Sequence, residues 1–252
     1  MGNYAMTGGA TGIGAAIRKT LIDDGHSVIV VDIKQADIKA DLSSAEGRNA
    51  AIAQLQEKCA AGLDGFIACA GVASQAPPTL TTSLNYYGTV ELVEGLRDLL
   101  AKSKGNVILV SSNSAPMSND KEYVETLLEK DEAAALKLAE NIDGHQAYSG
   151  TKLAVARWMR RNISSFTDQG IRINAIAPGY TQTPMTEAVE NDPVYGPKIK
   201  AFMESIPMGR AGKPEDMAKA TKFLLSEDSS FICGAVLFID GGHDAMLRPD
   251  QF

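Results

Sequence analysis

The chain has 252 residues, a formal net charge of −7 and a hydrophobic content of 44%. This length suffices for one large α/β domain with a buried core, and the composition is ordinary for a globular protein. The net negative charge argues against nucleic-acid binding, which needs clustered lysine and arginine. No apolar run approaches the roughly 20 residues that cross a bilayer.

Cysteine usage and the N-terminal residues bear on the compartment. The three cysteines are odd in number, far apart and in apolar contexts, so we expect reduced buried thiols rather than a disulfide framework, and no metal site. The N-terminus lacks a basic segment followed by an apolar stretch and a cleavage site. We therefore expect a cytoplasmic protein without a membrane span.

The first residues read as a strand near Asn3–Met6, a glycine-rich turn over residues 7–14 and a helix to about Asp24. The turn has the spacing T-G-x-x-x-G-I-G rather than the common G-x-G-x-x-G. Glycines let the backbone approach a diphosphate there, and the helix N-terminus supplies N–H groups and a favourable dipole. A tight structural connection would also explain the glycines, but the position at the first strand–helix junction favours nucleotide binding.

Asp32 ends the β-branched run that starts at Ser27, which is typical of a strand buried in a parallel sheet. An acid about 20 residues beyond the glycine turn can accept hydrogen bonds from an adenosine ribose, and it repels a 2′-phosphate. No arginine follows Asp32, and Thr11 rather than a basic residue precedes Gly12. NAD is therefore favoured over NADP. Lys34 argues the other way, and we interpret it as a solvated loop lysine.

The middle of the chain continues the alternation of strands and helices. Its expected elements are a strand ending near Ala40–Leu42, a helix from Ser43 or Ser44 to about Cys59, a buried strand over Leu63–Gly71, a helix from about Thr81 to Ala101 and a strand over Asn106–Ser112. Asp41 is placed to meet the edge of an adenine. Asn85 lies in an apolar part of its helix and needs hydrogen-bond partners if it is buried.

Tyr148 and Lys152 lie four residues apart in a helix expected from Ala147 to about Gln169. At this spacing both side chains project from one face, so the ammonium can lower the pKa of a phenol whose ordinary value is about 10. Such a phenol can act as acid and base near neutral pH, and the lysine can reach a ribose hydroxyl. Taken alone, Tyr-x-x-x-Lys describes a solvated helix face more often than a catalytic pair.

Two further strands, Gly170–Gly179 and Ala235–Gly242, complete the pattern. The alternation predicts an α/β fold with one doubly wound, Rossmann-type parallel sheet, flanking helices and right-handed crossovers. We expect residues 1–252 to form a single NAD-binding domain.

Together and in this order, these motifs resemble those of the short-chain dehydrogenase/reductase family, over residues 1 to about 242. The stretches that carry the resemblance are the T-G-x-x-x-G-I-G turn, Asp32, Asp41–Leu42, Asn85, Ser112, Tyr148-x-x-x-Lys152, Asn174–Gly179 and Asp240–Gly242. It implies a catalytic tetrad of Asn85, Ser112, Tyr148 and Lys152, with Ser111 as the alternative to Ser112. The cofactor-binding residues that it implies are Gly8, Thr11, Gly12, Ile13, Gly14, Asp32, Asp41, Leu42, Ala70, Gly71, Tyr148, Lys152, Pro178, Gly179, Thr181 and Thr183.

The resemblance also implies a mechanism. In oxidation, Tyr148 as phenolate removes the alcohol proton while a hydride passes to the nicotinamide, and Ser112 hydrogen-bonds the substrate oxygen. Lys152 lowers the pKa of the tyrosine and binds the ribose, while Asn85 holds a water that connects Lys152 to solvent. Thr183 binds the nicotinamide carboxamide. We interpret His145 as a residue of the rim, outside the proton path.

Two departures from the family pattern stand out. The Asn-Asn-Ala-Gly that often follows the fourth strand is Ala-Cys-Ala-Gly at residues 68–71, so we expect some rearrangement on the adenine side. Ser112 and Tyr148 are 36 positions apart, which is more than in common members. The insertion, about 113–146, reads as an amphipathic helix or a pair of short helices. Because catalytic residues flank it, we expect changed oligomerisation with some shaping of the pocket.

The insertion and the ending Asp240–Phe252 resemble those of a bacterial 3α-hydroxysteroid dehydrogenase/carbonyl reductase branch. This implies an NAD-dependent homodimer or homotetramer that interconverts an apolar cyclic secondary alcohol and its ketone. The region 185–208, which contains several methionines, is expected to supply much of the pocket. A cyclic monoterpenoid or another small secondary alcohol is the alternative substrate, and a non-catalytic NAD-binding regulator is the alternative class of protein.

Overall fold

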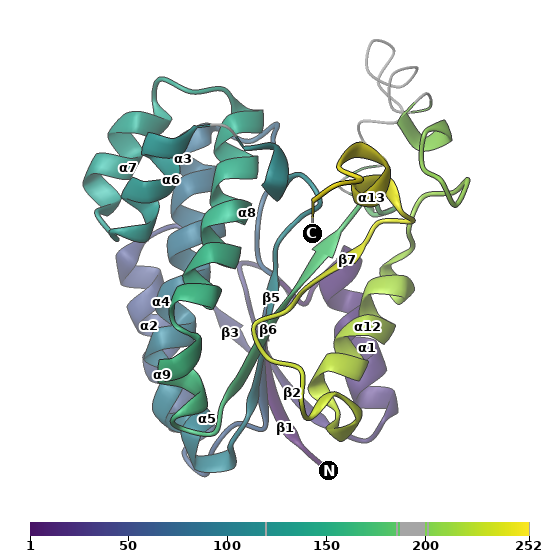
Figure 1. The fold of residues 1–252 in the computed structure, drawn as a ribbon. Coiled ribbons are helices and arrows are strands. Elements are labelled where there is room, and N and C mark those ends of the chain that lie inside the picture. The colour runs from purple at the N-terminus through teal and green to yellow at the C-terminus, as the bar shows by residue number, and fades with distance from the viewer. Residues whose placement is uncertain (119, 185, 187–199, 201, 252) are drawn as a thin grey trace.

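The computed structural model describes residues 1–118, 120–184, 186, 200 and 202–251. Its strands form one seven-stranded sheet in the order β3-β2-β1-β4-β5-β6-β7, with every neighbouring pair parallel (Figure 1). The strands are β1 Asn3–Thr7, β2 Ser27–Asp32, β3 Ile38–Lys39, β4 Gly65–Ala68, β5 Asn106–Val110, β6 Arg172–Pro178 and β7 Val236–Ile239. The predicted doubly wound α/β fold is confirmed.

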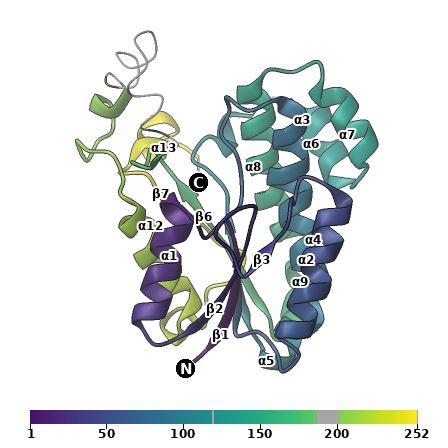
Figure 2. The ribbon, with the colours of Figure 1, turned by 180° about the vertical axis from the view of Figure 1, so that it is seen from behind.

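Helices cover both faces of the sheet, and each face has its own apolar core (Figure 2). On one face lie α1 Gly12–Asp23 and α12 Pro214–Leu225; on the other lie α2 Ala45–Lys58, α4 Gly88–Gly95, α5 Arg97–Ser103, α8 Gly144–Arg161 and α9 Ile163–Thr167. Short turns η3 Glu227–Ser229 and α13 His243–Leu247 flank β7. Because both faces are covered, the central strand β4 is buried at all four of its residues. Among the described helices, none is long and apolar enough to span a bilayer.

The helix expected from Thr81 to Ala101 is interrupted in the structure. It consists of α3 Pro78–Thr81, a π-helical turn η1 Thr82–Tyr87, α4 and α5. The π-helical turn carries Asn85, whose side-chain amide bonds both the N–H and the carbonyl of Val72. Widened helical turns of this kind are frequent at functional sites.

The helix that carries Tyr148 and Lys152 starts earlier than expected and ends earlier. Asp143 caps its first turn by accepting from the backbone N–H of Gln146, and the Gln146 side chain accepts from the N–H of Asp143. This Asp-x-x-Gln pair is a capping box. The helix then breaks at Asn162, so the expected single helix to Gln169 is two helices, α8 and α9.

Two short helices, α6 Lys121–Leu128 and α7 Glu132–Ala139, follow the turn η2 Ala115–Met117 in the insertion (Figure 1). They pack against α8 and η1 through buried apolar side chains, which include Tyr123 and Leu127. A buried arginine of α2 also joins them to the body of the protein. Arg48 bonds Glu91 of α4 at 2.6 Å and Glu132 of α7 at 2.5 Å.

Candidate active site

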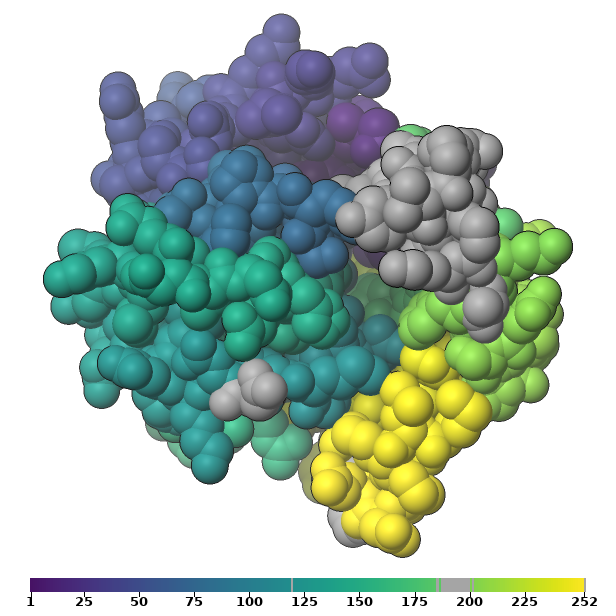
Figure 3. Space-filling view, turned by 90° about the horizontal axis from the view of Figure 1, so that it is seen from above, coloured from purple at the N-terminus to yellow at the C-terminus, as the bar shows by residue number. Residues whose placement is uncertain are grey.

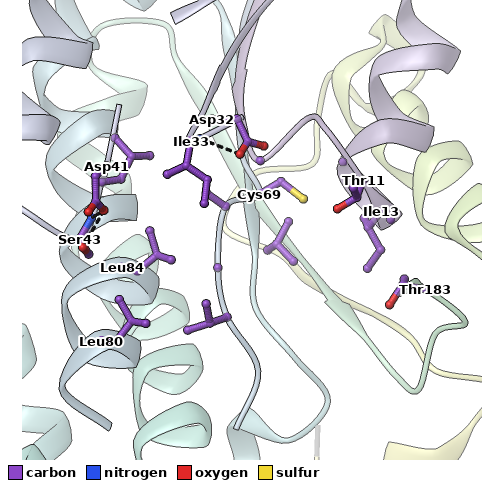
Figure 4. Close-up of a pocket in the computed structure, with 18 of the residues that line it drawn as sticks. Thr11, Ile13, Asp32, Ile33, Asp41, Ser43, Cys69, Leu80, Leu84 and Thr183 are labelled. Carbon is purple, nitrogen blue, oxygen red and sulfur yellow. Dashed lines mark hydrogen bonds between the residues drawn. The ribbon is translucent and has the colours of Figure 1, made fainter. Parts of the chain in front are cut away.

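The strand order reverses between β1 and β4, and a cavity of about 510 Å³ opens at the carboxyl ends of the strands there (Figure 4). Ligands of open α/β sheets bind at such a switch point. Predicted cofactor residues that line this cavity are Gly8, Thr11, Gly12, Ile13, Gly14, Asp32, Asp41, Leu42, Ala70, Gly71, Tyr148, Lys152 and Thr183. The structure thus brings together most of the predicted cofactor set.

The glycine-rich turn has a backbone that side chains would disturb. Gly8 and Gly12 have φ of 73° and 55°, in the left-handed region that favours glycine. A Cβ on Gly14 would lie 1.8 Å from the carbonyl oxygen of Gly8, so α1 starts in direct contact with the turn. The Thr11 side chain does not cap α1, and no acidic residue occupies the first turn. The N–H groups and positive dipole end of α1 therefore suit a diphosphate.

Asp32 and Asp41 line the part of this cavity where the adenosine of the cofactor is predicted to bind; we call this part the adenosine half. The Asp32 carboxylate accepts from the N–H of Ile33 at 2.7 Å and from the N–H of Ala10 at 3.3 Å, which fixes it beside the glycine turn. Asp41 accepts from the hydroxyl and the N–H of Ser43, and these bonds lower the pKa of its carboxyl. Asp32 is therefore positioned for a ribose diol.

Sequence reasoning missed the apolar walls of the adenosine half. Ile33, Leu80 and Leu84 line it; in Figure 4, Ile33 lies between Asp32 and Asp41, and Leu84 and Leu80 lie below Asp41. Ile33 is 64% exposed in the structure, and the only signal for it in the sequence is an apolar residue directly after the aspartate that ends the strand. A flat aromatic base fits between such side chains.

The departure at residues 68–71 is compensated by a hydroxyl on the neighbouring strand. Thr7, at the end of β1, accepts from the N–H groups of Cys69 and Ala70 at 3.1 and 3.0 Å. The Cys69 side chain itself lines the cavity, and burial raises the pKa of its thiol to about 11. The backbone on this side is therefore held without a side-chain amide.

Tyr148, Lys152 and Ser112 come together where β5 meets α8. Ser112 lies close enough to the Tyr148 phenol to lower its pKa by hydrogen bonding, and Ser112 Oγ accepts from the hydroxyl and the N–H of Ser114 at 3.0 and 3.2 Å. Ser111 points elsewhere, because its hydroxyl donates to the backbone carbonyl of Lys152 at 2.9 Å. This geometry distinguishes the two serines and supports the choice of Ser112.

The electrostatics of the pair differ from the sequence expectation. Lys152 is 6% exposed, its Nζ lies 5.7 Å from the centre of the Tyr148 ring, and it donates to the carbonyl of Val110 at 2.7 Å. Burial lowers the pKa of Lys152 to about 8. The pKa of Tyr148 is raised by burial, and the hydrogen bond from Ser112 offsets only part of that effect. Burial therefore outweighs the effect of Ser112 in setting the direction of the Tyr148 pKa.

Asn85 is buried behind the cavity wall, where its Oδ1 accepts from the N–H of Val72 at 2.9 Å and its Nδ2 donates to the carbonyl of Val72 at 3.0 Å. A Cβ added to Gly71 would lie 2.9 Å from Asn85 Oδ1 and 3.7 Å from Lys152 Nζ. Gly71 thus lets the chain pass close to both side chains. The buried amide has the partners that the sequence analysis required.

A second cavity, of about 430 Å³, adjoins the first at Ile13, Val110, Tyr148 and Thr183. The predicted cofactor residues Pro178, Gly179 and Thr181 line this second cavity rather than the first, as does Ser112. His145 lies at its exposed edge, as expected for a rim residue. Its other walls include residues that sequence reasoning missed: Ala73, Ser74, Gln75, Asn113, Ser114 and Tyr180. Of the expected pocket region 185–208, residues 185, 187–199 and 201 lie outside the described residues, and Phe202 lines the cavity.

Comparisons with known proteins bear on the family. The family model described as "short chain dehydrogenase" matches residues 3–124, and the one described as "Enoyl-(Acyl carrier protein) reductase" matches residues 133–244. The 3-alpha-hydroxysteroid dehydrogenase/carbonyl reductase of Comamonas testosteroni is 40% identical over 259 residues, with 100% of each chain covered. The protein belongs to the short-chain dehydrogenase/reductase family. This confirms the resemblance on which the sequence analysis relied.

Other relatives of this short-chain dehydrogenase/reductase agree. The crystal structure of the 3-alpha-hydroxysteroid dehydrogenase from Pseudomonas sp. B-0831 complexed with NADH has 41% identity and a TM-score of 0.94, with 99% of this chain and 100% of that chain covered. The cis-4-hydroxycyclohexanecarboxylate dehydrogenase of Sinomonas cyclohexanicum is 28% identical, with 96% of each chain covered. The protein is therefore an oxidoreductase that acts on alcohol or carbonyl groups of small substrates, in a family that uses nicotinamide cofactors.

Proposed function

We propose that this enzyme uses NAD to interconvert an apolar cyclic secondary alcohol and its ketone, with a 3α-hydroxysteroid or related carbonyl compound as substrate. The observation that carries the proposal is the junction of the two cavities at Tyr148, with Ser112 on the substrate side and Lys152 on the cofactor side. The relatives named as 3-alpha-hydroxysteroid dehydrogenases support the choice of substrate class.

In this proposal the residues at the junction divide the chemistry. A bound nicotinamide accepts the hydride in oxidation and supplies it in reduction. The Tyr148 phenolate takes the hydroxyl proton of the alcohol in oxidation, and the neutral phenol returns a proton to the carbonyl oxygen in reduction. Ser112 donates a hydrogen bond to the substrate oxygen, and Lys152 binds the ribose hydroxyls from the cofactor side.

The supporting residues follow from the same geometry. Asn85 holds the chain at Val72, and with it the edge of the cavity next to Lys152. Thr183, which lines both cavities, is placed to bind the carboxamide of the nicotinamide. Asp32 accepts from the ribose diol and, as an anion, opposes a 2′-phosphate, so we infer a preference for NAD over NADP.

The raised pKa of Tyr148 gives the proposal a pH dependence. Oxidation needs the phenolate, so the rate of oxidation should rise with pH through the alkaline range, whereas reduction uses the neutral phenol and should fall there. Cofactor binding adds charge next to the phenol. The pH–rate profile therefore reports the pKa of Tyr148 in the complex with the cofactor.

The insertion bears on assembly. The helices α6 and α7 pack on α8 and η1. Glu125 of α6 pairs with Arg161 of α8, and Lys130, between α6 and α7, pairs with Glu94 of α4. These contacts cover part of the outer surface of α8 and η1, which is then not available for pairing with another subunit. We infer a homodimer or homotetramer that assembles through another face, and sedimentation at several protein concentrations tests it.

The deciding experiment follows NADH formation with NAD or NADP and a panel of 3α-hydroxysteroids, cyclic monoterpene alcohols and simple secondary alcohols. Turnover of the steroids with NAD supports the proposal. If only terpenoid alcohols react, the mechanism stands and the substrate class is wrong. If nothing reacts and NADH still binds, a non-catalytic NAD-binding regulator is the better description.

Replacement of Tyr148 by Phe tests the chemistry directly. Turnover should collapse while NADH binding survives. Tyr86→Phe is the matched control, because the buried Tyr86 hydroxyl has no hydrogen-bond partner in the described structure. A Tyr148→Phe enzyme as active as Tyr86→Phe would refute the role of the phenol.

A further inference from the structure

His243 is a buried imidazole at the start of α13 that the proposed chemistry does not use; it is 4% exposed. We propose that His243 is a positioning residue that fixes the far wall of the substrate cavity and so makes the enzyme prefer flat, multi-ring apolar alcohols over small ones. The inference rests on the proposed function. Figure 3 looks onto this end of the molecule, where the C-terminal residues and the segment from residue 202 onward lie side by side next to a hollow.

The first contact of His243 is with Asn113, which lines the cavity immediately after Ser112. Asn113 Nδ2 lies 3.4 Å from His243 Nδ1, so a neutral imidazole accepts from the amide. The backbone N–H of Asn113 donates to the carbonyl of Pro178 at 3.0 Å. Both the main chain and the side chain of Asn113 are therefore anchored.

The second contact of His243 is with Phe202, on a different wall of the same cavity. The two ring centres are 4.8 Å apart with an interplanar angle of 81°, an edge-to-face arrangement. Phe202 also meets Tyr180 edge to face, at 6.0 Å. Phe202 is 38% exposed and lines the cavity, so part of its ring surface is accessible while His243 and Tyr180 contact the rest.

His243 can support two walls because its own backbone is fixed. Gly241 and Gly242 have φ of 67° and 87°, and these left-handed residues turn the chain from β7 into α13. The Asp240 carboxylate then accepts from the N–H groups of Gly242 and Asp244 at 3.0 and 2.6 Å. The N–H of Met208 donates to the carbonyl of Gly241 at 3.1 Å, which ties the segment of Phe202 to the same turn.

The consequence concerns the size and shape of the substrate. A small alcohol held by Tyr148 and Ser112 reacts without covering the distant wall. A flat skeleton of several fused rings extends farther and packs on the accessible part of the Phe202 ring. This contact adds binding energy only if the Phe202 ring is held in place. Loosening of the wall should therefore penalise large substrates and spare small ones, because the lost contact is made only by the large ones.

The test compares His243→Gln, which removes the ring that packs on Phe202, with the wild type, using NAD and two alcohols, a 3α-hydroxysteroid and cyclohexanol. We expect kcat/KM for the steroid to fall about tenfold, mainly through KM, as for the loss of one aromatic pair, and cyclohexanol turnover to change less than about twofold. NADH affinity should be unchanged. His26→Gln is the control, because His26 lies at the opposite end of the sheet, against Tyr4.

A double-mutant cycle identifies the route of the effect. If His243 acts through the ring of Phe202, adding His243→Gln to Phe202→Ala should cost little more steroid activity than Phe202→Ala alone. Asn113→Ala, which keeps the imidazole, provides a second variant if His243→Gln does not fold, and it should also lower the steroid-to-cyclohexanol ratio. Additive losses of steroid activity in the double variant, or equal losses of activity on both alcohols, would overturn the inference about His243 and leave the proposed function standing. A wild type that oxidises neither alcohol would remove the proposed function with it.

Discussion

Replacement of Lys152 by Met should destroy activity and yet stabilise the fold at neutral pH. The Lys152 ammonium is buried, and burial lowers its pKa from the ordinary 10.5 to about 8. Below pH 8 the residue is charged in both the folded and the unfolded chain. Only the folded chain buries the ammonium, so the free-energy cost of its desolvation lowers the stability of the fold. A pKa difference of this size corresponds to about 3 kcal/mol.

The substitution also removes a hydrogen bond, which offsets part of this stabilisation. Methionine cannot donate to the carbonyl of Val110, and leaving this buried oxygen without its partner costs about 1 kcal/mol. The net expectation at pH 7 is a Lys152→Met protein more stable by about 2 kcal/mol, which for a chain of this length is an increase in Tm of roughly 5 °C.

The sign of the pH dependence provides the check. Between pH 8 and 10.5 the unfolded chain binds more protons at this residue than the folded one, so the wild type gains stability there relative to the variant. The advantage of Lys152→Met should shrink by about 3 kcal/mol across this range and reverse near its upper end.

The assay is guanidinium unfolding of both proteins at fixed concentration from pH 7 to 10.5. Lys121→Met, at an exposed position, is the control and should show no comparable change. A Lys152→Met protein that is less stable than the wild type at pH 7 would refute the argument from desolvation.

Three further outcomes are expected. Asp32→Asn should relax the preference of NAD over NADP by removing the anion opposite the 2′-position, measured as the ratio of kcat/KM for the two cofactors. Gly14→Ala should weaken NADH binding at least about tenfold, measured by fluorescence titration, because its Cβ would collide with the carbonyl of Gly8 and displace the turn. Arg172→Met should lower the free energy of unfolding by about 3 kcal/mol, since the guanidinium bonds four backbone carbonyls around the end of α12; a loss below about 1 kcal/mol by chemical unfolding would show that water replaces these bonds.

Sequence patterns predicted the fold because each strand is an apolar run followed by a turn signal. The strand Ser27–Asp32 has the predicted bounds, since the run ends in a charged residue at the sheet edge. Helix ends were predicted less well. The π-helical turn at Asn85 depends on a hydrogen bond with Val72, 13 residues away, and no local periodicity encodes such a contact.

The site was predictable to the extent that its residues belong to short motifs. The glycine turn, Tyr148 and Lys152 could be placed from spacing, and family resemblance added Ser112. The contact between Asn113 and His243 joins residues 130 positions apart, so only the folded chain brings them together. The direction of the pKa of Tyr148 was also beyond the sequence, because burial is a property of packing and not of spacing.

The buried guanidinium of Arg48 joins the insertion to two helices of the sheet's outer layer, α2 and α4. It donates to Ser43, next to the loop that lines the adenosine half of the cavity, and to Glu132 of α7. Loss of this one cation would leave Glu91 and Glu132 as neighbouring anions and would push α7 away from α4. Arg48 thus links the insertion to the nucleotide loop, so a change that detaches α7 should also speed the exchange of backbone amide hydrogens with solvent in the loop around Ser43.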